Sequence, residues 1–327
     1  MKRRDFIKVV GGSLAAWPAT AHAQQPVRRV GVLMSTAQSD PREVASINAF
    51  LAELEKRGWS RGKNLEVIVR WGEADSRQMT ANAAELVGLN PDVLLAKGAH
   101  VPAARQATTK IPIIFVVLID SAAEAIVGAF SRPIGNVTGF TTYEHELVGK
   151  RLGMLRDLSP RINRVLYIRS RQSGVATQSL LDRLVSEAKT VGLPVVDGPG
   201  QSEGDIESAV QDFAREPDGG VMIAFDAFTL IYRQQIVALA QRHRLPAIYP
   251  SRAFSQSGGL CCYGTDQDDQ FRQAAGYVVR LLEGAKPSDL PVQAPTKFDL
   301  LINRTTAKNL GLTIPPMLLA TADEIED

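Results

Sequence analysis

The sequence predicts an α/β protein built from two doubly wound, Rossmann-like lobes. Short apolar runs rich in β-branched residues alternate with longer segments in which apolar residues recur at helical spacing. The runs are apolar on both faces, which is typical of parallel sheets covered by helices on both sides. The alternation occurs in two consecutive series of similar size, and 327 residues are enough for two domains with separate cores.

The first series begins at Val30, and its predicted strands are 30–34, 65–69, 93–96 and 111–119. Between the first two strands, Val44, Ile47, Phe50, Leu51 and Leu54 recur at helical spacing. Gly58 is placed to end that helix. The next helix carries Met79, Ala83, Leu86 and Val87.

The second series begins after 136–139. Its predicted helices are 144–158, 177–191, 206–215 and 228–243, and its predicted strands are 164–168, 193–196, 221–225 and 246–249. A helix over 267–283 and a proline-punctuated link over 286–295 then lead to a lone strand, 298–302. Because a lone strand needs a sheet to join, we expect the chain to cross again between the two lobes.

The first 23 residues predict a twin-arginine export signal. The pair Arg3-Arg4 is followed by a short apolar stretch, and Ala21-His22-Ala23 supplies a small-x-small cleavage site. The apolar stretch is too short to cross a bilayer. A cytoplasmic amphipathic helix is the alternative interpretation. We expect cleavage after about Ala23 and a mature protein in a bacterial periplasm.

Charge and composition argue against several function classes. The formal net charge is +2, and the first eight residues alone carry +3, so the rest of the chain is near −1, unlike a nucleic-acid-binding protein. Cys261 and Cys262 are adjacent, and without a C-x-x-C spacing we expect two small apolar residues in a strand.

Motifs for catalysis or cofactor binding are not found. His22, His100, His145 and His243 form no metal-ligand spacing with other residues. The sequence has no G-x-S-x-G elbow and no Walker A loop. The glycine pair at 198–200 is a poor dinucleotide loop, because Pro199 between the glycines removes a backbone donor. We therefore expect no enzymatic activity, no metal and no cofactor.

A candidate ligand-binding set follows from the positions just beyond the predicted strands, where doubly wound sheets bind ligands. Small, hydroxyl-bearing and glycine residues dominate it. In the first lobe and the crossover the set comprises Ser35, Thr36, Gly98, Ala99, Asp120, Ser121, Thr141, Thr142 and Tyr143. In the second lobe it comprises Ser173, Asp226, Tyr249, Ser251 and Arg252, with Gln172 adjoining.

Each member also has a structural interpretation. Asp226 is placed to cap a helix that begins at the next residue, and the serines suit caps or turns. Tyr143 and Tyr249 suit packing positions, and Arg252 suits a surface ion pair. His100 fits the start of a helix better than a ligand contact. As ligand residues, the hydroxyls would bind a carboxylate and Asp226 an amine.

A series of segments that spans nearly all of the mature chain carries a family resemblance. The segments are 29–33, 62–65, 84–87, 91–93, 111–115, 135–140, 244–249, 284–291, 295–298 and 311–316. Together they resemble the ABC-transporter substrate-binding proteins related to tryptophan/tyrosine-type uptake systems. The resemblance implies a type I periplasmic binding protein with three interdomain crossings. It also implies a small-molecule ligand, ABC permease and ATPase subunits as partners, and a monomer.

The expected lobes follow from these crossings. Lobe 1 takes 27–142 plus 263–290, and lobe 2 takes 143–262 plus 291–327. Two departures from the family pattern, Cys261-Cys262 for Met-Ser and Asp120-Ser121 for Asp-Pro, fall near the expected ligand site. An aromatic amino acid or a related aromatic acid is the expected ligand. A periplasmic sensor that feeds a receptor is the alternative to a transport role.

Overall fold

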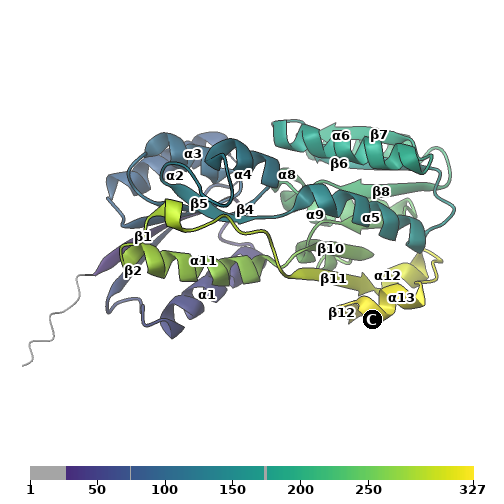
Figure 1. The fold of residues 1–327 in the computed structure, drawn as a ribbon. Coiled ribbons are helices and arrows are strands. Elements are labelled where there is room, and N and C mark those ends of the chain that lie inside the picture. The colour runs from purple at the N-terminus through teal and green to yellow at the C-terminus, as the bar shows by residue number, and fades with distance from the viewer. Residues whose placement is uncertain (1–26, 74, 173–174) are drawn as a thin grey trace, which may run out of the picture.

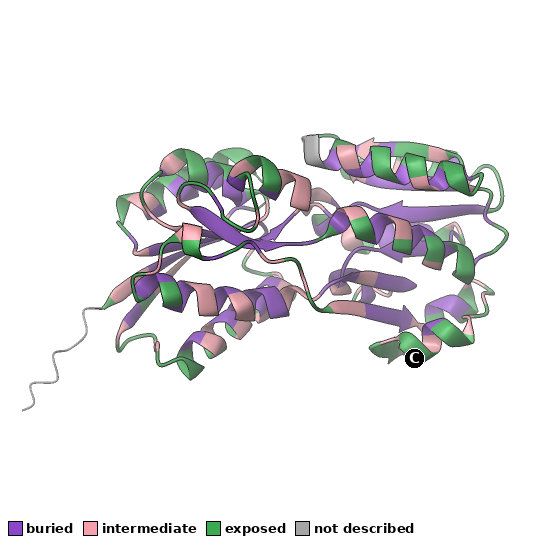
Figure 2. Ribbon diagram, in the orientation of Figure 1, coloured by how far each residue is buried: buried purple, intermediate pink, exposed green. Residues whose placement is uncertain are grey.

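The computed structural model describes residues 27–327 apart from 74, 173 and 174, and it folds into two lobes that lie side by side (Figure 1). Each lobe contains one β-sheet with helices on both faces, which confirms the predicted α/β fold. Buried residues occupy the strands and the sheet-facing sides of the helices (Figure 2). The predicted export signal and Ser173 lie outside the described residues.

The first lobe has a five-stranded parallel sheet in the order β2-β1-β3-β4-β5. The strands are β1 (Arg28–Met34), β2 (Leu65–Trp71), β3 (Val93–Lys97), β4 (Ile113–Leu118) and β5 (Val137–Thr141). One face carries α1 (Pro41–Lys56) and α11 (Gln267–Leu282), and the other carries α2 (Ser76–Gly88), α3 (His100–Ala107) and α4 (Asp120–Val127). Gly58 follows α1 with φ 86°, a left-handed conformation that ends the helix as predicted.

The second lobe has a seven-stranded sheet in the order β12-β11-β10-β9-β8-β6-β7, in which β11 runs antiparallel to β10. The strands are β6 (Arg164–Ser170), β7 (Val195–Gly200), β8 (Gly219–Ile223), β9 (Ala247–Tyr249), β10 (Cys261–Thr265), β11 (Phe298–Asn303) and β12 (Glu324–Glu326). The expected lone strand is β11, and it joins this sheet.

The helices of the second lobe cover both faces of its sheet. One face carries α5 (Glu144–Leu158), α6 (Val175–Thr190), α12 (Arg304–Asn309) and α13 (Pro316–Thr321). The other carries α7 (Glu203–Phe213), α8 (Ala227–Ile231), α9 (Arg233–Arg242) and α10 (Arg252–Ser255), and the 3-10 turn η1 (Pro287–Asp289) precedes β11. The predicted helix 228–243 is therefore two helices, which divide at Tyr232.

The chain crosses between the sheets after β5, again between β10 and α11, and a third time before β11. The second and third crossings lie slightly later than the sequence predicts. Tyr263 belongs to β10, which pairs with β9 and β11 in the second sheet. Val292 and Gln293 still donate backbone hydrogen bonds to Phe130 and Gly139 of the first lobe. Backbone hydrogen bonds between strands set where these two crossings begin, and the residue types along the chain do not reveal those bonds.

Hydrogen bonds tie the three crossing segments to one another. The Thr265 hydroxyl donates to the Thr142 carbonyl over 2.7 Å. The Asp266 N–H donates to the Lys297 carbonyl over 3.1 Å, and the Thr141 N–H donates to the Gln293 carbonyl over 3.0 Å. The crossings thus form one connected strip between the lobes.

Candidate ligand-binding site between the lobes

The sequence-predicted set lies where strands of both sheets end toward the junction of the lobes. Ser35-Thr36 follow β1, Gly98-Ala99 follow β3, and Asp120-Ser121 follow β4 at the start of α4. Thr141 ends β5, and Thr142-Tyr143 lead into α5. In the second lobe, Asp226 follows β8 and Ser251 follows β9. Parallel strands bring these positions to one edge of each sheet.

Six of these residues carry a buried side-chain oxygen that has no hydrogen-bond partner in the described part of the chain. The atoms are Thr36 Oγ1, Asp120 Oδ1, Ser121 Oγ, Thr141 Oγ1, Thr142 Oγ1 and Ser251 Oγ. Buried polar atoms in folded proteins are nearly always bonded to protein or water, because leaving one unpaired costs about 1–3 kcal/mol. These six oxygens at strand ends, which we call the strand-end cluster, are therefore available to a polar ligand or to water.

Of the other predicted residues of lobe 1 and the crossover, Ser35 and Gly98 have structural bonds, whereas Tyr143 is partly exposed. The Ser35 hydroxyl donates to the Lys97 carbonyl over 2.6 Å. Gly98 has φ 45°, and its N–H donates to the Val116 carbonyl, so it shapes the turn into α3. Tyr143 is 41% exposed and adopts a left-handed conformation with φ 60° just before α5.

In lobe 2, Asp226 and Arg252 already have partners. Asp226 caps α8 by accepting from the Thr229 N–H over 2.8 Å, and it also accepts from the Ser170 N–H over 2.9 Å. Burial raises the pKa of the Asp226 carboxyl above its ordinary value. Arg252 pairs with Asp299 over 3.2 Å and with Glu324, so its guanidinium is engaged within its own lobe.

Packing explains several of the aromatic and sulfur-bearing residues. Tyr249 is buried and stacks on Phe254 with ring centroids 5.1 Å apart. His100 starts α3 and is fully buried, as expected for a structural residue. Cys261 and Cys262 are buried in β10, as the sequence predicts, and burial raises the pKa of Cys261 to about 12.

One contact joins the lobes beside this set. Asp120 Oδ2 lies 3.2 Å from His145 Nδ1 on α5, and His145 Nε2 lies 3.0 Å from the Ser179 hydroxyl on α6. Asp120 therefore faces lobe 2 with one oxygen, while its other oxygen is unpaired. The sequence set named Asp120 without its partner, because His145 and Ser179 lie on helix surfaces rather than at strand ends.

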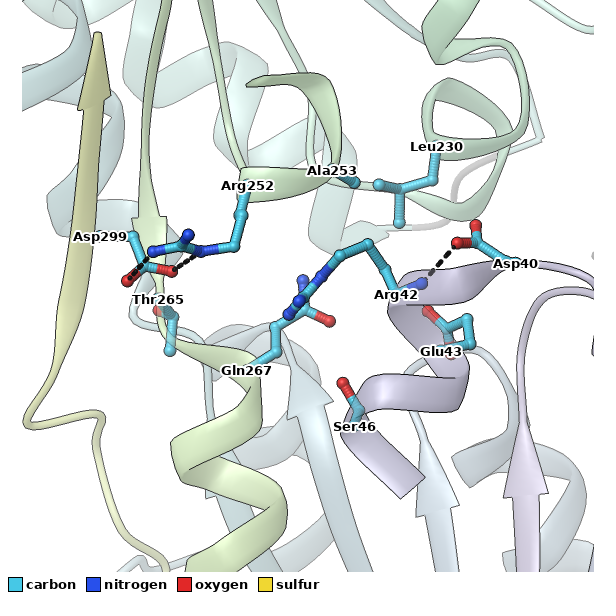
Figure 3. A pocket seen from close by; sticks show the side chains of 10 residues that line it. All are labelled: Asp40, Arg42, Glu43, Ser46, Leu230, Arg252, Ala253, Thr265, Gln267 and Asp299. Atoms are coloured by element: carbon cyan, nitrogen blue, oxygen red, sulfur yellow. Dashed lines mark hydrogen bonds and ion pairs between the residues drawn. The ribbon is translucent and has the colours of Figure 1, made fainter. Parts of the chain in front are cut away.

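A small cavity of about 20 Å³ lies between the lobes, on the side of α1 (Figure 3). A cavity of this size holds about one water molecule and is too small for an amino acid. Lobe 1 contributes Asp40, Arg42, Glu43, Ser46 and Gln267, and lobe 2 contributes Leu230, Arg252, Ala253, Thr265 and Asp299. Of these ten residues, the sequence predicted Arg252 alone.

One of the nine residues that the sequence did not predict, Glu43, had a signal in the sequence. Glu43 lies four positions before Ile47 and seven before Phe50, on the apolar stripe of α1. A charged residue at such a position is buried with a partner, and the partner here is Lys97 at the end of β3. Neither lies just beyond a strand, so the strand-end rule did not select them.

Two general features of the described residues bear on function. No helix among them is long and apolar enough to cross a membrane. No group of three or more histidine, cysteine or acidic side chains among them is arranged to hold a metal ion.

Comparison with known proteins identifies the family. The family model described as ABC transporter substrate binding protein matches residues 32–326. A tyrosine-binding protein of Clostridioides difficile (strain R20291) is 24% identical over 264 residues, which cover 80% of this chain and 75% of that protein.

Solved structures agree with this match. A conserved domain protein from Vibrio cholerae superposes with a TM-score of 0.84 at 26% identity, over 92% of this chain and all of the other. An ABC domain from Streptococcus pneumonia in complex with L-Trp gives 0.83 at 22% identity, over 91% and 99%. A ligand-free, open substrate-binding protein from Clostridium difficile gives 0.69 at 21% identity, over 92% and 99%. From its sequence and fold, this chain belongs to the family of ABC transporter substrate-binding proteins.

Proposed function

We propose that this protein is the periplasmic solute-binding component of an ABC importer and holds a small carboxylate-bearing ligand between its lobes. The observation that carries the proposal is the cluster of unpaired buried oxygens at the strand ends. Five of the six come from lobe 1 and the crossover, and Ser251 comes from lobe 2. A ligand held between the lobes would satisfy both groups at once.

Hydroxyl donors suit the carboxylate of this ligand. Thr36, Ser121, Thr141 and Thr142 each bring one O–H that no described residue accepts. Hydrogen bonds to a charged acceptor contribute about 1.5–3 kcal/mol, more than bonds between neutral groups. The tyrosine-binding relative and the L-Trp complex support an aromatic amino acid or a related aromatic acid as the ligand.

Hinge closure is the proposed means of binding. The three crossing segments are the natural pivot, because they join the lobes and bond to one another. Closure would create a surface shared by both lobes that the ABC permease recognises, with the ATPase subunit driving transport.

Binding can be tested with purified protein lacking residues 1–23. A thermal-shift screen over amino acids, aromatic acids and sugars should select an aromatic compound, since ligand at 100 times its Kd stabilises by about 2.7 kcal/mol. Small-angle scattering should give a smaller radius of gyration at saturation than without ligand, and an unchanged radius would count against closure. Selection of sugars or aliphatic amino acids alone would contradict the aromatic ligand.

Two threonines of β5 and the crossover test the site itself. Thr142→Val removes an unpaired hydroxyl, so it should weaken ligand binding by about tenfold without lowering the stability of the free protein. Thr138→Val is the matched control, because that hydroxyl donates to the Leu290 carbonyl over 2.5 Å. It should lower stability and leave the Kd nearly unchanged. The reverse pattern would place the ligand elsewhere.

A further inference from the structure

The carboxylates that line the interlobe cavity differ in how fully they are bonded. Asp40 accepts from the Arg42 N–H with one oxygen and pairs with Arg233 through the other. Asp299 receives Arg252 on both oxygens. Glu43 bonds Lys97 through Oε1, while its Oε2 is buried and has no partner among the described residues. Glu43 Oε2 is thus the unused acceptor of the carboxylates lining this cavity.

The position of Glu43 in α1 does not explain this arrangement. Asp40 caps the helix and Glu43 stands three residues later, the spacing of a capping box. In a capping box Glu43 would accept from the Asp40 N–H, but that N–H donates to the Ala37 carbonyl. The side chain is instead directed to Lys97, at the carboxyl edge of the sheet.

Lys97 holds Glu43 in a largely buried position. The Lys97 and Glu43 side chains are 4% and 6% exposed. Lys97 directly precedes Gly98, and its carbonyl accepts from the Ser35 hydroxyl, so the pair lies beside two residues of the predicted ligand-binding set. A buried ion pair of this kind is costly to desolvate and is repaid only when its remaining atoms are also bonded. One charged oxygen of this pair lacks such a bond.

We infer that Glu43 Oε2 accepts a hydrogen bond from the ammonium group of the ligand and so sets the preference for amine-bearing ligands. This inference rests on the proposed binding function and names the chemistry of its ligand. Asp226, the acid that the sequence suggested for this role, has both oxygens bonded to backbone N–H groups. Glu43 instead has an oxygen without a partner among the described residues, and it borders a cavity large enough for one water-sized group, such as an ammonium.

The test compares ligands that differ by the amine alone. L-Trp and L-Tyr are paired with indolepropionate and hydroxyphenylpropionate, and the Kd of each is measured by calorimetry. Wild-type protein should prefer the amine-bearing member of each pair by about tenfold or more. Glu43→Gln should remove most of that preference. It should raise the Kd of the amino acid and leave the Kd of the amine-free acid nearly unchanged.

Two further variants separate this role from a structural one. The double variant Glu43→Met with Lys97→Met replaces the whole buried pair with apolar side chains of similar volume, which proteins often tolerate without loss of stability. It should bind the amine-free acids and lose the preference for the amine. Glu144→Gln is the matched control, since Glu144 is equally buried but both of its oxygens are bonded by Arg151. It should keep the wild-type preference.

The possible outcomes are distinct. An unchanged preference in Glu43→Gln and in the double variant would overturn the inference and leave the proposed function standing. Binding of amine-free acids alone by the wild type would overturn it as well, again without affecting solute binding. Failure of every compound in the panel to bind the wild type would overturn both this inference and the proposed ligand class.

Discussion

Asp40 and Arg233 form an ion pair across the junction of the lobes. Asp40 Oδ2, at the N-cap of α1 in lobe 1, lies 3.0 Å from Arg233 Nη1, at the start of α9 in lobe 2. Both side chains are mostly buried, with 13% and 19% exposed. Because the pair joins elements of different lobes, any opening of the lobes at this side would break it.

Arg233→Gln should therefore weaken ligand binding by a small factor. A partly screened ion pair contributes about 0.2–1 kcal/mol, which corresponds to a rise in Kd of up to about fivefold. The wild-type Kd should also rise with salt more steeply than that of the variant. Arg215→Gln, which removes an exposed pair with Asp212 within lobe 2, is the control and should have no effect. Equal salt dependence of wild type and Arg233→Gln would contradict the prediction.

Gln270 supports a distortion of β4 beside the first crossing segment. Val117 has φ 56°, which is rare for a β-branched residue, and the pairing of β4 with β5 shifts register there. The Gln270 side chain accepts from the Val117 N–H over 2.9 Å and donates to the Thr141 carbonyl over 2.5 Å. It thus replaces backbone bonds that the bulge removes.

Gln270→Leu should lower the free energy of unfolding by about 2–4 kcal/mol, because two buried backbone groups lose their partners. Urea denaturation would measure the loss. Gln211→Leu, on the exposed side of α7, is the control and should change stability by less than about 0.5 kcal/mol. Similar stabilities for the two variants would mean that water or a rearranged strand replaces Gln270.

The sequence predicts long elements better than short ones. The helix expected over 144–158 is α5, with the same bounds, because fifteen residues carry a clear apolar period. β5, α4, α12, α13 and β12 were not assigned, since runs of three to eight residues carry little periodicity. The division of 228–243 at Tyr232 depends on the Asp226 cap and on tertiary packing, which periodicity does not report.

The candidate site also contains residues that the sequence predicts and residues that it does not. The strand-end rule selected Thr36, Asp120, Thr141 and Thr142, because topology alone places such residues at a sheet edge. It could not decide that Arg252 would pair with Asp299, because that contact joins segments 47 residues apart. Glu43 was missed although its place on the apolar stripe of α1 was visible.

His100 should make stability depend on pH. The imidazole is fully buried, neither ring nitrogen has a hydrogen-bond partner among the described residues, and burial lowers its pKa from 6.5 to about 4. Between these values the unfolded chain binds a proton that the folded chain does not, so stability falls as pH drops from 6.5 toward 4. The loss is at most about 1.4 kcal/mol per pH unit.

His100→Leu should flatten this part of the stability profile without lowering stability at pH 7, since it removes two unpaired buried nitrogens. Urea denaturation at pH 7 and pH 5 would show it. Met79→Leu changes the same packing environment, beside Gly72 and His100, without a titrating group. That control should shift stability equally at both values of pH. A variant profile parallel to the wild type would contradict the prediction.

Gly264 lies where β10 passes the end of β9. A Cβ atom at this position would lie 1.9 Å from the Pro250 carbonyl oxygen, so backbone would have to move. Arg151 contacts the same carbonyl and donates to the Tyr263 carbonyl, and Ser251 of the proposed site follows Pro250. Displacement of this segment would disturb both the buried Arg151 and the lobe 2 wall of the site.

Gly264→Ala should therefore lower the free energy of unfolding by about 2 kcal/mol or more and weaken ligand binding as well. Gly153→Ala is the matched control, because nothing lies within 4 Å of the added Cβ in the middle of α5. Alanine is the better helix former, so this variant should gain up to about 1 kcal/mol and keep its Kd. Thermal and urea denaturation together with calorimetry would compare the two. If Gly264→Ala is as stable as wild type, the β9–β10 corner adjusts freely, and its tight packing does not fix the position of Ser251.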